Sequence, residues 1–165
     1  MKKSIFYAIV FVTGLFLQFT AAQYVSIRGV APNAVLLMLI FLALLRGAEA
    51  GMMMGFLWGL SWDMYSVDLF GCHAFAFTCI GFVIGMLSRK WDEEKIISQM
   101  VLTLLTTIIY WFLIYFCYKI FNPEVFTFKL NYIVVLQPFY NMLLAPVVFW
   151  IFVFILGILK FDEEQ

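Results

Sequence analysis

The segment Arg46–Asp63 reads RGAEAGMMMGFLWGLSWD and decides how the chain folds. Glycine recurs in it at every fourth position, at Gly47, Gly51, Gly55 and Gly59, and Asp63 continues the same spacing. Because four residues turn an α-helix by about 400°, the row drifts by only ~40° per step and forms a slanting ridge of bare backbone. Small residues allow helices to approach closely in lipid, where no hydrophobic drive brings them together. The spacing therefore predicts a membrane helix that packs along this ridge.

The next apolar segment repeats the spacing more weakly in Gly81 and Gly85. Two interpretations of the glycines are open from sequence alone. The ridge either packs against another helix of the same chain or receives the transmembrane helix of a partner protein.

Composition indicates an integral membrane protein. Of 165 residues, 65% are hydrophobic and 12% are charged, against about 45–50% and about 25% in soluble domains. Apolar runs predict six helical spans in a single polytopic domain covering residues 1–165: 4–22, 31–46, 49–65, 70–88, 96–118 and 131–158. Pro138 and Pro146 are expected to break or kink the last helix. The short remaining loops exclude a soluble catalytic or receptor domain.

The distribution of basic residues predicts orientation, because cytoplasmic loops carry more Lys and Arg. With the N-terminus inside, seven basic residues lie on the cytoplasmic side: Lys2, Lys3, Arg46, Arg89, Lys90, Lys95, Lys160. Three lie outside: Arg28, Lys119, Lys129. We expect both termini to be cytoplasmic, with Arg46 and Glu49 in one cytoplasmic turn.

A polar cluster is predicted near the outer surface. Asp63 ends the third span, Asp68 lies in the following turn, and His73 opens the fourth span. Carboxylate–imidazole groups can move protons or bind metal, but at a helix boundary they more often cap and hydrogen-bond. No further His or Cys is spaced to complete a metal site. Arg28 is the expected cation for Asp63, because Arg46 lies about 25 Å away along the helix.

The sequence predicts no catalysis and no cofactor. It contains no paired nucleophile and base, no phosphate loop and no pair of intramembrane carboxylates. Cys72, Cys79 and Cys117 lie in apolar runs without ligand spacing, so we expect buried small hydrophobic residues. Ten basic and ten acidic residues balance, which does not favour nucleic-acid binding.

The order of motifs between Ala31 and Ser88 resembles the bacterial rod shape-determining MreD family. The motifs are Ala31-Pro32-Asn33, Arg46-Gly47, the glycine series ending in Asp63, and Leu69-Phe70-Gly71. The first, fifth and sixth spans match only as apolar segments.

This resemblance implies a non-catalytic scaffold of the elongasome in the bacterial inner membrane. Such a scaffold would bind the bitopic protein MreC and help couple MreB filaments to the RodA glycosyltransferase and its penicillin-binding transpeptidase. The family is also similar to the six-helix S-component fold of energy-coupling-factor transporters, so a vitamin-binding transporter subunit is the alternative. The first span lacks the Ala-xxx-Ala pattern by which those subunits dock, and the outer loops offer few polar groups for a ligand.

Overall fold

The computed structural model describes residues 2–21, 24–26, 29–65, 69–88, 95–121 and 132–159, and within these it is helical without a β-strand. The predicted all-helical fold is therefore confirmed. The elements are α1 (Lys2–Phe16), the π-helical turn η1 (Leu17–Ala21), α3 (Ala34–Arg46), α4 (Ala48–Tyr65), α5 (Cys72–Leu87), α6 (Ile96–Phe121) and α7 (Tyr132–Leu159).

By length and composition, two of the helices are long and apolar enough to cross a membrane: Ile96–Phe121 and Ile133–Phe154. Three further helices are apolar but shorter, such as Ala34–Arg46. The 13 residues of α3 extend about 20 Å at 1.5 Å per residue, less than the ~30 Å of hydrocarbon. Six complete crossings therefore stay a prediction.

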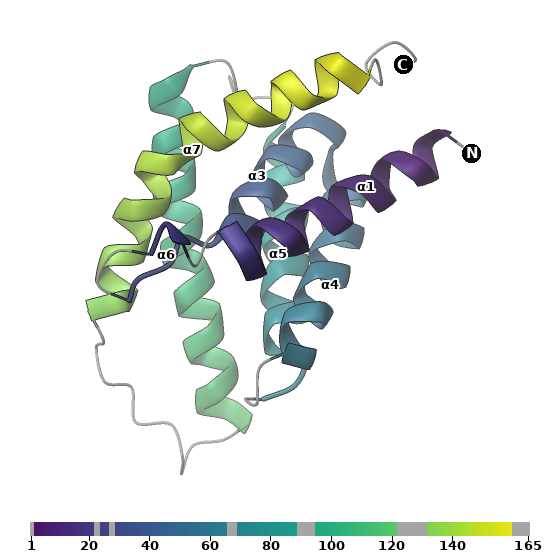
Figure 1. The fold of residues 1–165 in the computed structure, drawn as a ribbon. Helices are drawn as coiled ribbons and strands as arrows, with labels where there is room; N and C mark the ends of the chain where they lie inside the picture. Colours follow the sequence, from purple (N-terminus) through teal and green to yellow (C-terminus); the bar gives the residue numbers. More distant parts are fainter. Residues whose placement is uncertain are drawn as a thin grey trace.

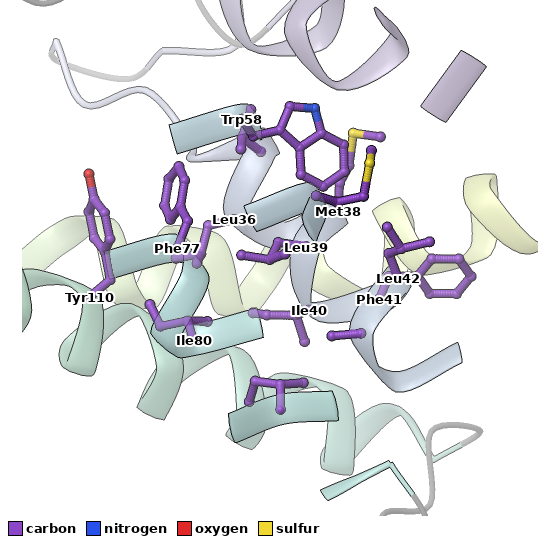
Figure 2. Close-up of a cluster of buried hydrophobic side chains, with 14 of the residues drawn as sticks. Leu36, Met38, Leu39, Ile40, Phe41, Leu42, Trp58, Phe77, Ile80 and Tyr110 are labelled. Atoms are coloured by element: carbon purple, nitrogen blue, oxygen red, sulfur yellow. The ribbon is translucent and has the colours of Figure 1, made fainter. Parts of the chain in front are cut away.

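The short helix α3 lies at the centre of the bundle. All ten residues from Val35 to Leu44 are buried, and α3 contacts α1, α4, α5, α6 and α7. A helix that is apolar on every side needs neighbours on every side. Figure 2 shows Leu36, Leu39 and Ile40 among side chains from the surrounding helices.

Four of the other five helices form two pairs around α3. α4 packs against α5, and α6 packs against α7. Figure 1 shows the start of α1 and the end of α7 toward the same end of the bundle. The outward faces carry large apolar side chains, among them Phe112 at 63% exposure and Trp150 at 68%. So much exposed apolar surface is rare in soluble monomers and suits contact with lipid.

The two prolines of the last span do not break its helix. Pro138 and Pro146 both lie inside α7, and Figure 1 shows α7 changing direction along its length. Proline removes a backbone hydrogen bond and bends a helix, but membrane helices tolerate it where neighbouring groups satisfy the released carbonyls.

Candidate functional site

The polar centre of the protein is the carboxylate of Asp63, which is 2% exposed in the last turn of α4. Its Oδ1 accepts a hydrogen bond from the backbone N–H of His73 at 3.0 Å, and its Oδ2 accepts one from Ala74 at 2.9 Å. Both donors belong to the first turn of α5. Asp63 therefore caps a helix other than its own.

This cap replaces one that α5 cannot provide for itself. The N-cap residue is Gly71, which has φ of 96° and no side chain to offer. A helix start leaves four N–H groups without intrahelical partners, and here all four are satisfied. The backbone N–H of Cys72 donates to the carbonyl of Leu69, and that of Phe75 donates to the carbonyl of Gly71. The two N–H groups between them, of His73 and Ala74, donate to Asp63.

The side chain of His73 completes the same arrangement. Its Nδ1 lies 2.8 Å from Oδ1 of Asp63, and an ionised carboxylate can only accept, so Nδ1 is the donor. Trp62 stacks on the imidazole with ring centroids 5.7 Å apart, and Phe77 and Tyr110 contact it at 6.4 and 6.2 Å. Aromatic rings thus enclose the imidazole beside the carboxylate.

These contacts make the Asp63–His73 pair a clasp between α4 and α5. The negative charge lies at the N-terminal end of α5, where the helix dipole favours an anion. Charge-assisted hydrogen bonds of this kind contribute roughly 1.5–3 kcal/mol each. Within the described part of the chain, no three His, Cys, Asp or Glu side chains are grouped to hold a metal ion. The other two expected members, Arg28 and Asp68, lie outside the described residues.

The glycine ridge of α4 lies against the backbone of α5. A Cβ built on Gly51 would lie 2.4 Å from the carbonyl oxygen of Gly81, and one on Gly55 would lie 2.4 Å from that of Phe77. A Cβ on Gly59 would lie 2.4 Å from the Cα of Ala74. Cβ atoms do not occur this close to backbone. The helix that faces the ridge is thus part of the same chain, and the pairing order makes the two helices antiparallel.

One glycine of the series has a different role from the one expected. Gly47 is not in α4 but ends α3, with φ of 82°, and a Cβ there would meet nothing within 4 Å. Its place is explained by the left-handed backbone conformation, which glycine adopts without steric cost. Its neighbour Ala48 contacts the opposing helix instead, since a Cβ on Gly85 would lie 2.4 Å from the Ala48 Cα.

Arg46 and Glu49, which the sequence predicts in one turn, lie at the junction of α3 and α4. Arg46 ends α3, and its guanidinium lies over the ring of Phe6 at 5.0 Å from the centroid. This cation–π contact ties α3 to α1. Glu49 is exposed in the first turn of α4, where an acidic side chain favours the helix dipole.

Sequence reasoning missed a second polar network at the start of α3. The backbone N–H of Asn33 donates to Asn141 Oδ1 at 2.9 Å, and Asn141 Nδ2 donates to Thr107 Oγ1 at 3.2 Å. All three residues are at most 2% exposed. The network joins α3, α6 and α7. Its signal was the amide of Asn141 inside the apolar α7, because polar residues in membrane helices face the protein interior.

A parallel link lies one turn earlier on α7. Gln137 Nε2 donates to the carbonyl of Ala31 at 3.0 Å, and Gln137 Oε1 accepts from Trp111 Nε1 at 2.9 Å. The segment that leads into α3 is therefore held to the α6–α7 pair by two amide side chains.

Comparison with known families extends the similarity beyond the central motifs. The family model described as rod shape-determining protein MreD matches residues 2–159. The match includes the first, fifth and sixth spans. Comparison with curated proteins and with solved structures gave no match. A family match over nearly the whole chain, on a helical fold with an apolar exterior, shows that the chain belongs to the MreD family of rod shape-determining proteins.

Proposed function

We propose that this protein is a non-catalytic scaffold of the elongasome in the bacterial inner membrane. In this role it binds an MreC-like bitopic protein and helps couple MreB filaments to the RodA glycosyltransferase and its penicillin-binding transpeptidase. Family membership supports a role in rod shape. The single observation that favours a scaffold is that the Asp63–His73 pair is used to join α4 to α5.

The second polar network also joins helices to one another. Asn33, Asn141 and Thr107 bond to one another across three helices. Buried polar groups that satisfy each other rigidify and specify a fold. A rigid bundle with an apolar exterior suits a protein that holds others in place within the membrane.

The proposed topology has six spans with both termini in the cytoplasm. The seven-to-three distribution of basic residues supports it. The beginning of α1 and the end of α7 lie toward one end of the bundle (Figure 1), as an even number of crossings requires. Arg46 lies near the start of α1, because its guanidinium is over the ring of Phe6. Lys119 lies in the last turn of α6.

Nothing in the described residues favours the transporter alternative. A cavity of about 470 Å³ lies between the start of α5 and the end of α6, and its lining consists of glycine, apolar side chains and two cysteines. A vitamin site needs a few convergent polar groups. The similarity to the S-component fold stays a prediction.

Purification from native membranes tests the scaffold proposal. A mild-detergent extract of cells that carry the tagged chain should yield the MreC-like protein of the same organism, identified by mass spectrometry. An unrelated tagged six-span protein is the control. Recovery of a pair of ABC-type ATPases without any wall-synthesis protein would contradict the scaffold and support the transporter subunit.

A further inference from the structure

Two of the three cysteines meet across a helix interface. Cys72 is the first residue of α5 and Cys117 lies in the last turns of α6. They are 3% and 5% exposed, and both side chains line the same cavity between the two helices. Cys79, the third, lies two turns further along α5 and is half-buried. The chain thus brings together two thiols that are 45 positions apart (117 minus 72).

The cavity of about 470 Å³ gives small molecules access to this pair. Cys72 and Cys117 both belong to its lining, with Phe70, Phe75 and Phe116 around them. These three phenylalanines are about half exposed or more, so the cavity lies at the surface of the bundle. Its volume is within the range of about 300–1,000 Å³ found for small-molecule sites. Buried thiols are inert when nothing can reach them, and here the cavity removes that barrier.

The location of the pair also bears on its chemistry. Cys72 lies at the same end of the bundle as Asp63, since Asp63 caps the first turn of α5. In the proposed orientation this end faces the outside, where disulfides form and persist. The connection between α5 and α6 lies at the opposite end, after Leu87 and before Ile96. A Cys72–Cys117 bond would therefore link α5 to α6 at the end of the bundle where the chain itself does not connect them.

We propose that Cys72 and Cys117 are an oxidisable pair that forms an intramolecular disulfide by exchange with a disulfide-bearing oxidant. One thiol loses its proton to water, and its thiolate attacks a sulfur of the oxidant, which leaves as a thiolate. The second cysteine then loses its proton and attacks the mixed disulfide. The Cys72–Cys117 S–S bond forms and the second oxidant thiolate leaves. The two cysteines lose two electrons and the oxidant disulfide gains them.

Thiol counting on the full-length protein tests the pair directly. Open membrane vesicles are treated with oxidised glutathione, quenched with acid, denatured and labelled with a maleimide that adds a fixed mass. Reduced protein should take three labels, one for each cysteine. After oxidation it should take one label, located on Cys79 by peptide mass spectrometry, and reducing agent should restore all three. Vesicles that are open on both sides make this result independent of the proposed orientation and function.

Single variants separate this pair from other reactions of thiols. Cys79→Ser should fall from two labels to none on oxidation. Cys72→Ser should not lose two labels together, because Cys117 has no Cys72 thiol with which to close the bond. Any label that this variant loses should be replaced by a glutathione adduct of measurable mass. Three labels on the oxidised wild-type chain would overturn the proposal. So would a stable glutathione adduct on Cys72 or Cys117, or a disulfide-linked dimer on a non-reducing gel.

Discussion

Asp63 has an unfavourable place in its own helix and a favourable place in the next one. In the last turn of α4 a negative charge opposes the helix dipole. The backbone N–H groups of His73 and Ala74, at 3.0 and 2.9 Å, compensate for this at the start of α5. The carboxylate is buried, so removing a partner leaves a polar group unsatisfied away from water.

Asp63→Asn should therefore lower the stability of the fold. The amide keeps one acceptor oxygen but presents an NH₂ group to a backbone donor, and it loses the charge. We expect a loss of about 1–3 kcal/mol, measured as a lower midpoint of thermal unfolding in detergent. Glu49→Gln is the matched control, because it removes an exposed carboxylate from the same helix. Equal midpoints for Asp63→Asn and the wild type would show that the clasp contributes nothing.

The contacts of individual residues differ in how well they can be predicted from the sequence. A lone carboxylate beside apolar helices is conspicuous, so the proximity of Asp63 and His73 could be expected from their places at consecutive helix ends. Their partners could not, because backbone donors leave no mark in a sequence. Asn141 was missed since its bonding partner Asn33 lies 108 positions away. Arg28, the expected cation, lies outside the described residues.

At the scale of helices, the glycine spacing specifies close packing but not the identity of the opposing helix. The repeat in Gly81 and Gly85 was the clue that α5 could supply a matching surface. The structure places Gly51 against Gly81 and Gly55 against Phe77. Gly47 shows the limit of the pattern, because a helix-ending glycine and a packing glycine have the same spacing in sequence.

Gly55→Leu should separate α4 from α5. Its Cβ alone would lie 2.4 Å from the Phe77 carbonyl oxygen, so the helices must move apart along the ridge and lose many dispersion contacts. We expect destabilisation of about 3 kcal/mol or more and degradation of the variant, measured as its abundance in membranes by immunoblot.

Leu57→Phe provides the comparison for this substitution. Leu57 is 40% exposed on the same helix and lies about 200° around it from Gly55, so extra volume there meets lipid. Its abundance should equal that of the wild type. Normal abundance of Gly55→Leu would contradict the close packing. Loss of partner binding at normal abundance would assign the ridge to a partner helix.

For the whole molecule, the central question is how the bundle crosses the membrane. Hydropathy predicted all six helical segments, because apolar runs bounded by charges are visible in any membrane sequence. It could not predict that α3 would be enclosed by the five other α-helices. That follows from pairwise packing and from the buried amides, which depend on contacts between distant parts of the chain.

The topology can be measured with single cysteines in a chain whose native cysteines are serine. Tyr24 is 91% exposed after the first helix, and Lys95 is exposed just before α6. In intact cells, Tyr24→Cys should react with a membrane-impermeant maleimide and Lys95→Cys should not. Both should react once the cells are broken. Labelling of Lys95→Cys in intact cells would show that the predicted orientation is wrong.

Depletion of the chain from the bacterium that carries it tests the role in cell shape most directly. Immunoblotting establishes that the chain is gone, and microscopy measures the ratio of cell length to width over the following generations. A scaffold of lateral wall synthesis predicts that the ratio falls toward that of a sphere and recovers when the wild-type chain is expressed again. Cells that keep an unchanged ratio through continued growth without the chain would contradict the account.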